Sequence, residues 1–294
     1  MADASVSKTP GKTISTWMSG LRAWHEINSA EWSGGDEFVV HIKTAAAKRG
    51  ACPSCPKRRP VTLEHLFALR EGLQTSNSFD VAVWAVALCA FWGCCHLGEL
   101  TIPSHNAFDE HLHVAKSAPI SFRRHFGGAE SAQFHIPWAK MERQEGADLI
   151  FTSREDLCPV EALRAHLKAN TDVPANAPFF AFKTSDSSWA PMTKDWFLKR
   201  CRDIWEPLNL DFIHGHSFRP GGATELLLAG VPPETVAKQG RWKSLAFLIY
   251  WRKLEDLIPA MITKSYDPTR IAELKNSFEQ FRIRHRLPSA ISIE

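Results

Sequence analysis

The sequence predicts a mainly helical fold with a small antiparallel β-sheet, and three observations support this prediction. Apolar residues recur at helical spacing over most of the 294 residues. Short alternating segments bounded by turn residues occur only near the middle of the chain. The composition, 44% hydrophobic and 23% charged, is typical of folded globular proteins and excludes a collagen-like repeat and a coiled-coil rod.

The first 50 residues are predicted to form a small helical domain. Apolar residues at helical spacing indicate one helix over residues 12–31 and another over 38–48. Residues 51–60 contain three prolines and a basic cluster, which predict a linker. We therefore expect a helical domain over 1–50, this linker, and a larger domain beyond it.

The larger domain, residues 61–258, is predicted to combine helices with the sheet. Thr62 is expected to cap its first helix, and Asp80 an apolar helix over 81–92. Alternation and flanking turns predict strands at residues 111–116, 132–138 and 148–152. Helical spacing predicts four further helices, at 159–167, 196–208, 218–229 and 245–254.

The sequence predicts no membrane-spanning segment. The longest uncharged apolar run, fifteen residues from Val81 to Cys95, is shorter than the roughly 18 that a spanning helix needs. The N-terminal stretch MADASVSKTPGKT lacks the apolar core of a signal peptide. Seven cysteines in a chain too large to need disulfides favour a reducing compartment. We expect a soluble, intracellular protein without a membrane partner.

Both ends of the chain are mildly basic. Residues 1–60 hold nine lysines and arginines against five acidic residues, and residues 259–294 hold six against four. Residues 61–258 hold twenty against twenty-three. Basic ends fit contact with a nucleic-acid backbone, but an ordinary solvated surface gives the same balance.

The stretch HGHSFRPGGATELLLAG carries the residues most informative about chemistry. His216 and Arg219 stand three apart at a predicted helix start, so they share one face. Tyr250, one of only two tyrosines, follows 31 residues after Arg219. This set suits phosphoryl transfer to a protein nucleophile, because a phenol of pKa ~10 needs a base and a phosphodiester needs a cation.

These motifs resemble the tyrosine recombinase (phage integrase) family, in which HSFR is followed by a glycine ten residues before a tyrosine. The segments GRWKSLAFLIYWR and WGCCHLGEL are more similar still to the crypton-type recombinases of fungal transposons. The resemblance covers almost the whole chain and implies the family's catalytic-domain fold over 61–258. The first 50 residues then correspond to a short remnant, truncated or reduced, of its helical core-binding domain.

By this resemblance, Tyr250 is the nucleophile that attacks the scissile phosphate and forms a 3′-phosphotyrosyl bond. Arg219 would clamp a non-bridging oxygen, and His216 would act as general base and later as acid. Lys140, in the turn after FHIPWA, matches the lysine that protonates the departing 5′ oxygen. Because the covalent bond stores the phosphodiester energy, the resemblance implies no metal and no other cofactor.

The family's next catalytic position, a histidine or tryptophan, corresponds to Trp242 or to Arg241. Counting back nine residues from Tyr250 gives Arg241, whereas Trp242 matches by residue type. We select Trp242 as the catalytic residue. Arg241 and Lys243 beside it are then expected to contact DNA.

His96 departs from the family pattern. The G-x-R-x-x-E-L box carries the first catalytic arginine, and here the box reads GCCHLGEL. Histidine lacks the bidentate fork of arginine and is mostly neutral at pH 7, whereas transition-state arginines contribute ~10³–10⁵ to rate. We therefore expect this chain to cleave DNA poorly or not at all while still binding it.

Double-stranded DNA is the expected partner. Arg123 and Arg124, in SFRRHF, either touch its phosphates or face water. In the family a C-terminal helix is donated to a neighbouring subunit, so the amphipathic tail over 259–294 implies a homo-tetramer on DNA. For a eukaryotic transposon the expected location is the nucleus, and otherwise the cytoplasm.

Three other functions remain open from the sequence. A decayed recombinase would bind DNA without turnover, and a type IB topoisomerase would use the same core chemistry. A zinc module would use Cys52 and Cys55, but no second ligand pair stands at suitable spacing. The HxH motifs that begin at His111 and His214 could also indicate a metal site, but such pairs arise by chance as well.

Overall fold

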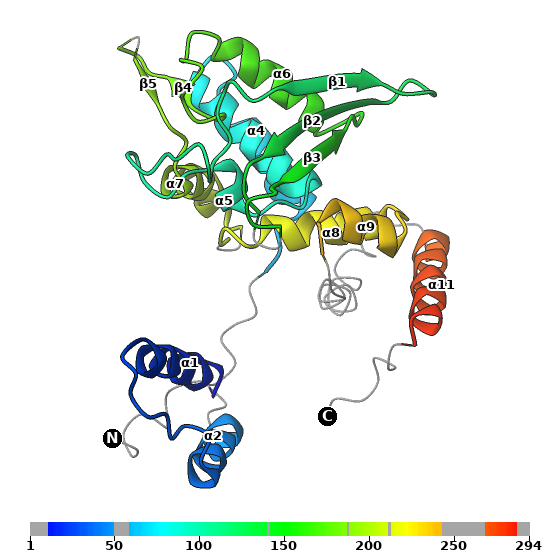
Figure 1. Cartoon of the computed structure of the whole chain (residues 1–294). Coiled ribbons are helices and arrows are strands. Elements are labelled where there is room, and N and C mark those ends of the chain that lie inside the picture. The colour runs from blue at the N-terminus through cyan, green and yellow to red at the C-terminus, as the bar shows by residue number, and fades with distance from the viewer. Residues whose placement is uncertain are drawn as a thin grey trace. The chain divides into compact units, whose positions relative to one another are not determined.

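The computed structural model comprises two units, residues 1–57 and residues 58–294, and each is described by itself (Figure 1). The structure describes the chain with gaps, over residues 11–49, 59–139, 142–186, 188–210, 213–242 and 268–286. The predicted linker lies outside these ranges except for its last two residues. Within them, none of the helices has the length and apolar character needed to cross a membrane.

The N-terminal unit contains two helices, close to those predicted. Helix α1 spans Gly11–Ile27 and α2 spans Glu37–Arg49, and the two contact each other. α1 ends before the predicted boundary because Ser29 adopts a left-handed conformation, with φ of 51°. Part of its apolar face is exposed, and Trp24 is 57% accessible.

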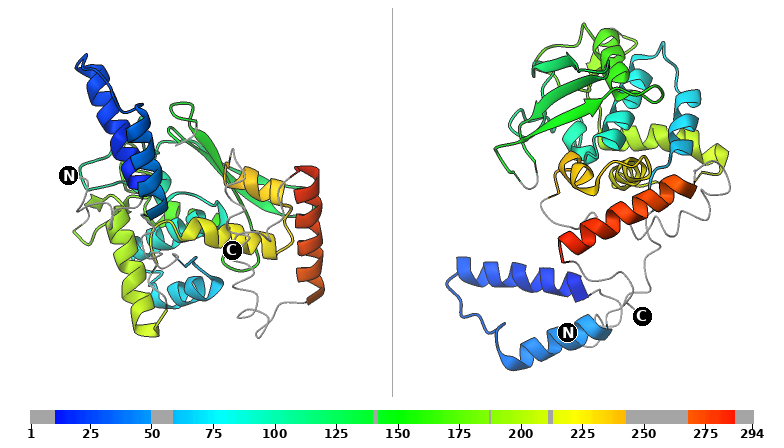
Figure 2. Two further views of the ribbon diagram at one scale, coloured as in Figure 1. Left: turned by 90° about the horizontal axis from the view of Figure 1, so that it is seen from below. Right: turned by 90° about the vertical axis from the view of Figure 1, so that its right-hand side faces the viewer.

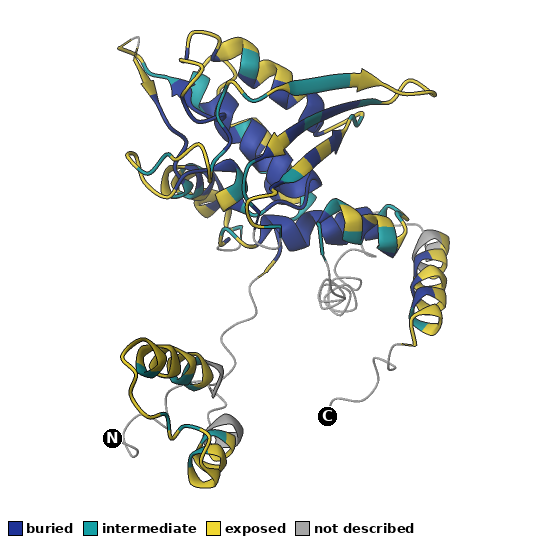
Figure 3. Ribbon diagram, in the orientation of Figure 1, coloured by how far each residue is buried: buried dark blue, intermediate teal, exposed yellow. Residues whose placement is uncertain are grey.

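The core of the larger unit is built around α4, Ser78–Trp92, in which twelve of fifteen residues are buried. A helix that is hydrophobic on all sides belongs in a core, and Figure 3 shows α4 as the buried centre of this unit. Helices α3 (Leu63–Gly72), α6 (Pro159–Ala169) and α8 (Phe218–Leu228) pack against it. The prediction of a mainly helical fold is confirmed.

The N-cap of α4 corrects one prediction. Asn77, not Asp80, caps the helix, because the Asn77 side chain accepts the N–H of Phe79 at 2.9 Å. Asp80 lies inside the first turn and is buried. Its carboxylate accepts hydrogen bonds from the Arg200 guanidinium at 2.8 Å and from the Gln74 N–H at 2.9 Å. Asp80 therefore joins α4 to its neighbours instead of capping it.

The three-stranded sheet is antiparallel, in the order β1 (Ile120–Arg124), β2 (Glu130–Ile136) and β3 (Ala147–Thr152). The last two strands lie close to their predicted positions, and the prediction of a small antiparallel sheet is confirmed. Consecutive strands are neighbours, so the sheet forms a simple meander.

The predicted strand at 111–116 is wrong. The Asp109 carboxylate accepts the N–H of His111 at 2.9 Å, and such local bonds of aspartate favour turns over strands. The apolar alternation there reflects single buried contacts, since Val114 is buried while Leu112 is exposed. The first strand begins later, at Ile120.

Several short elements carry no clear sequence signal. A second sheet pairs β4 (Phe182–Lys183) with β5 (Trp189–Ala190), two residues each. Helix α5 spans only Leu97–Leu100, and α9 spans Pro233–Gln239. Helix α7 (Lys194–Trp205), by contrast, lies close to the helix predicted at 196–208, and the 3₁₀ turn η1 (Glu206–Leu208) follows it directly.

Helices α8 and α9 lie between the three-stranded sheet and α11, which spans Pro268–Arg284 (Figure 2). α11 contacts α8, and its residues Leu274, Phe278 and Phe281 are buried. The apolar stripe predicted on the tail therefore packs against α8 of the same chain. The helix predicted after Ser244 lies outside the described residues.

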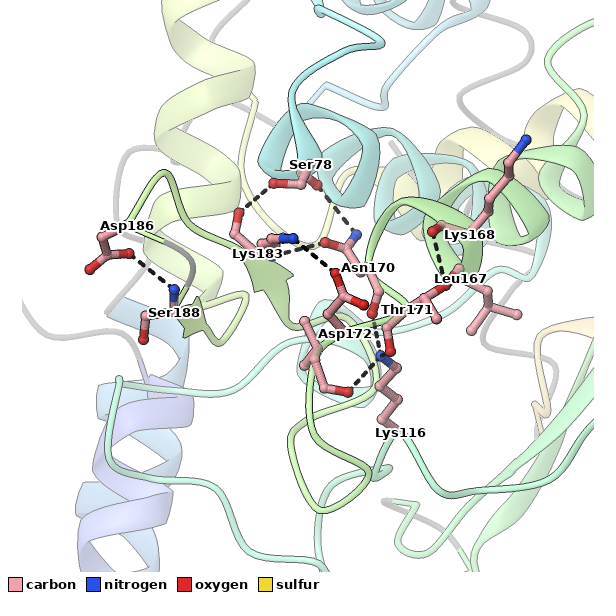
Figure 4. Close-up of polar contacts among 11 residues, drawn as sticks. Ser78, Lys116, Leu167, Lys168, Asn170, Thr171, Asp172, Lys183, Asp186 and Ser188 are labelled. Carbon is pink, nitrogen blue, oxygen red and sulfur yellow. Dashed lines mark hydrogen bonds and ion pairs between the residues drawn. The ribbon is translucent and has the colours of Figure 1, made fainter.

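A lysine holds the C-terminal end of α6 (Figure 4). Lys116 Nζ donates to the backbone carbonyls of Asn170, Thr171 and Val173, the last two at 3.0 and 2.7 Å. The Asn170 side chain in turn accepts the N–H of Lys183 at 2.9 Å. The carbonyls that Lys116 contacts belong to the C-cap of α6 and the turn after it, whereas the carbonyls of Leu167 and Lys168 in the last turn accept from the Thr171 hydroxyl at 3.0 and 2.9 Å.

Candidate functional site

Three segments that are distant in sequence meet at the start of α8. They are the turn from the end of α4 into α5, the first turn of α8, and the residues that follow α9. We call their polar and aromatic side chains the Arg219 cluster, which consists of His96, Glu99, His216, Arg219, Arg241 and Trp242.

Two glycines let these segments approach. A Cβ added at Gly222 would stand 1.7 Å from the carbonyl oxygen of Phe91, and one at Gly221 would stand 2.2 Å from that of Val61. A side chain at Gly222 would push α8 away from α4, and one at Gly221 would push it away from Val61, in the segment before α3. The PGG segment thus allows the contact that brings Arg219 against the end of α4.

Arg219 is the centre of the cluster and is 7% exposed. Its Nη1 donates to the Cys94 carbonyl at 2.5 Å and its Nη2 to the Gly240 carbonyl at 2.6 Å. The guanidinium carbon lies 4.1 Å from the ring centroid of Trp242. Burial, and then the charge of Arg241, lower the pKa of Arg219, which remains charged at neutral pH.

Glu99 holds the second arginine of the cluster. Its Oε2 pairs with Arg241 Nη2 at 2.6 Å and accepts the backbone N–H of His96 at 2.9 Å. The Glu99 and Arg241 side chains are only 9% and 13% exposed. Glu99 offsets one of the two guanidinium charges, so the cluster keeps a net positive charge that favours an anion.

The two predicted histidines meet at the edge of the cluster. The rings of His96 and His216 have centroids 5.9 Å apart and stand at 88° to each other. His96 is half-buried and His216 is exposed. The position where the resemblance expects an arginine therefore lies beside the predicted general base, within reach of the same ligand.

Left-handed backbone occurs at one residue of the cluster, Arg241, and at Cys94, whose carbonyl accepts from Arg219. Cys94 has a φ of 46° and Arg241 a φ of 56°, and both are non-glycine residues. Such conformations cost free energy and concentrate at functional sites. Cys94 and Cys95 are fully buried core residues, and this burial raises the pKa of both thiols to about 12.

Lys194 is a nearby cation that the sequence did not reveal. A Cβ on Gly215 would stand 2.9 Å from Lys194 Cε and 3.6 Å from its Nζ. The Lys194 side chain therefore crosses the backbone directly before His216. Its one sequence signal is its place at the first residue of α7, where a cation opposes the helix dipole.

The cluster contains five of the predicted site residues, namely His96, His216, Arg219, Arg241 and Trp242. Tyr250, Lys140 and Lys243 lie outside the described residues. Arg123 and Arg124 are at the end of β1 and are not part of the cluster.

The described residues contain no group of three or more His, Cys, Asp or Glu side chains arranged to hold a metal ion. Cys52 and Cys55, which form the CxxC pair, are outside the described ranges. Among described atoms of the first turn of α8, the Ser217 hydroxyl is buried without a hydrogen-bond partner.

No protein-family model and no curated protein matches this sequence. Among solved structures, the chain is similar to FLP recombinase in a Holliday junction complex, with a TM-score of 0.41 and 14% identity over 79% of this chain and 52% of that one. It is similar to XerA recombinase, with a TM-score of 0.41 and 13% identity over 96% of this chain and 85% of that one. The Flpe–Holliday junction complex gives a TM-score of 0.42 and 13% identity over 78% and 52%. The chain spans about half the length of the FLP and Flpe chains.

Proposed function

We propose that this chain is a DNA-binding protein of the tyrosine recombinase type, which breaks and rejoins DNA strands through a 3′-phosphotyrosyl intermediate. The observation that carries the proposal is the Arg219 cluster. Residues assigned to one reaction by the resemblance, taken from positions 96 to 242, meet there around a net positive charge. A positive, partly buried cluster with two histidines fits a phosphodiester.

In the proposed reaction the Tyr250 oxygen attacks the scissile phosphorus, and the bond from phosphorus to the 5′ oxygen breaks. His216 takes the phenolic proton, and Lys140 gives a proton to the leaving 5′ oxygen. Arg219 donates to a non-bridging oxygen as charge develops. Attack by a 5′ hydroxyl of another strand reverses these steps and releases the tyrosine.

His96 weakens the proposed activity. An arginine at this position would place a bidentate fork beside His216, whereas the imidazole offers one donor when neutral. Loss of an arginine of this kind costs ~10³–10⁵ in rate. The chain as written is therefore proposed to bind DNA well and to cleave it poorly.

Covalent trapping on a nicked suicide duplex, built from the ends of the element that encodes the chain, tests the proposal. Three proteins are compared: the chain as written, His96→Arg, and His96→Arg combined with Tyr250→Phe. An SDS-resistant adduct is expected with His96→Arg, at least ~10³-fold above the unaltered chain. It should disappear with Tyr250→Phe.

An equal adduct from the unaltered chain would show that His96 is tolerated. No adduct from any protein, on DNA that each one binds, would favour a binding protein without turnover. One observation supports this second function: Arg219 already donates to two backbone carbonyls, which is a structural task. The matched control is Tyr266→Phe, which removes the other phenol.

The finer assignments belong to the same proposal. The chain is proposed to be a crypton-type transposon recombinase that acts in the nucleus of its host. Helix α11 covers α8 within the chain, and the same buried stripe could be supplied in trans, as in domain swapping. A chain cut near residue 259 that still formed a tetramer on DNA would contradict this exchange.

A further inference from the structure

The β1–β2 hairpin presents an exposed aromatic ring between cations. Its tip, which we define as residues Arg123–Gly128, is exposed throughout. Phe126 is 109% accessible relative to the reference for its residue type, more than any other large hydrophobic residue described. A fully exposed phenylalanine is unfavourable in water, so its position calls for a contact.

The hairpin backbone holds this ring outward. Gly127 and Gly128 have φ of 90° and 86°, a conformation that side chains rarely adopt. The N–H of His125 donates to the Ala129 carbonyl at 2.8 Å, and the His125 ring bonds the Ser131 hydroxyl at 2.7 Å. The tip is thus a defined turn, and Phe126 projects from it because the turn requires it.

The charge at the tip is positive and uncompensated. In register, Arg124 faces Glu130, but Glu130 pairs with Arg164 at 2.8 Å. Neither Arg123 nor Arg124 forms an ion pair with another described residue. Two available guanidinium groups on a protruding β-ribbon match the geometry and charge of a DNA backbone.

The tip lies within reach of DNA at the Arg219 cluster. Gln239, beside Arg241, donates to the carbonyl of Ile150 on β3 at 2.8 Å, and Ile150 pairs with Gln133 on β2. From Gln133 to Glu130, the first residue of β2, the strand rises ~10 Å. This rise corresponds to about three base pairs of duplex, so one duplex can extend from the cluster to the hairpin.

We infer that the hairpin tip binds double-stranded DNA, with Arg123 and Arg124 on the phosphates and Phe126 inserted as a wedge at a base step in the minor groove. Apolar wedges flanked by arginines unstack such steps and bend the duplex. The inference rests on the proposed function only in taking DNA as the ligand.

Two variants test the inference: Arg123→Gln with Arg124→Gln, and Phe126→Ala. The double charge variant should lower the slope of log K against log salt by about 1.8, at ~0.9 per phosphate contact. Phe126→Ala should keep this slope and weaken binding about tenfold. It should also abolish the fluorescence rise of 2-aminopurine placed at the unstacked step.

Matched controls are Lys168→Gln with Lys275→Gln, two exposed cations elsewhere in the same unit, and Leu208→Ala, an exposed apolar residue at 56% accessibility. They should leave binding and slope unchanged. Thermal melting should be unchanged for every variant, because all these side chains are exposed.

Wild-type affinity and salt slope in both hairpin variants would overturn the inference, as would weakened binding to lipid vesicles with intact DNA binding. Adduct formation tests the proposed function separately from DNA binding. A hairpin variant that binds weakly but still gives adduct at saturating concentration in the His96→Arg chain supports both. Hairpin effects on binding without adduct from any chain would support the hairpin and contradict the recombinase.

Discussion

Lys116, beside the C-terminal end of α6, and Arg219, in the first turn of α8, both donate hydrogen bonds to backbone carbonyls. Lys116 has three N–H donors and gives them to three carbonyls. Arg219 has five and gives two to described carbonyls. The described carbonyls thus use every donor of the lysine but only two of the five donors of the arginine.

The balance of charge around the two cations also differs. Near Lys116, the opposite charges of Lys183 and Asp172 form an ion pair at 2.8 Å and so offset each other. Near Arg219 the neighbours are a second arginine and two histidines, with Glu99 as the carboxylate paired there. A cation at a helix end is therefore a candidate site only where it keeps both donors and excess positive charge.

The largest stability effect is expected at Glu99. Glu99→Gln leaves Arg241 as an uncompensated buried charge, which costs about 3–5 kcal/mol of unfolding free energy. Urea unfolding measures it. Combining Glu99→Gln with Arg241→Gln should recover part of the loss, and a single-variant loss below about 1 kcal/mol would mean that solvent already screens this pair.

The pH dependence of stability should report on His166, a buried residue of α6 that lies outside the Arg219 cluster. His166 Nε2 bonds the Phe179 carbonyl at 2.9 Å, and burial lowers the pKa of His166 from 6.5 to about 4. The unfolded chain therefore binds more protons between these values, so stability is complete above pH 6.5 and falls as pH falls towards 4. The expected loss is about 3 kcal/mol.

Urea unfolding from pH 7 to 4 measures this loss. The variant His166→Gln should unfold more easily at pH 7 and lose the part of the pH dependence that lies between 6.5 and 4. An unchanged pH dependence in this variant would assign the titration to another group. DNA binding per folded molecule should not depend on His166.

The smallest of these effects is expected at Lys116. Lys116→Met leaves carbonyls at the end of α6 without their cation, and because Lys116 is half-buried, water replaces it in part. The cost should be about 2 kcal/mol, against less than about 0.5 kcal/mol for the exposed Lys168→Met. A loss of DNA affinity in the fully folded Lys116→Met variant would contradict a purely structural role for Lys116.

Elements with strong local signals could be predicted. α4 could be predicted from its apolar run and α8 from its helical spacing. The resemblance selected His96, which the structure brings beside His216.

Features that depend on distant partners could not be predicted. The role of Asp80 is set by Arg200, 120 residues away, and Lys194 reaches Gly215 only through tertiary packing. The strands β4 and β5 have two residues each, too few for a period to be recognised. The 111–116 segment alternates but turns, because Asp109 bonds locally.

Arg219 is proposed to belong to a phosphate site, and Lys116 to the fold. Covalent trapping in the His96→Arg chain, scored per folded molecule, compares Arg219→Gln, Arg219→Lys and Lys116→Met. We expect both Arg219 variants to lower the adduct rate at least ~10³-fold and Lys116→Met to leave it within about twofold. Equal rates for Arg219→Gln and Lys116→Met would contradict it.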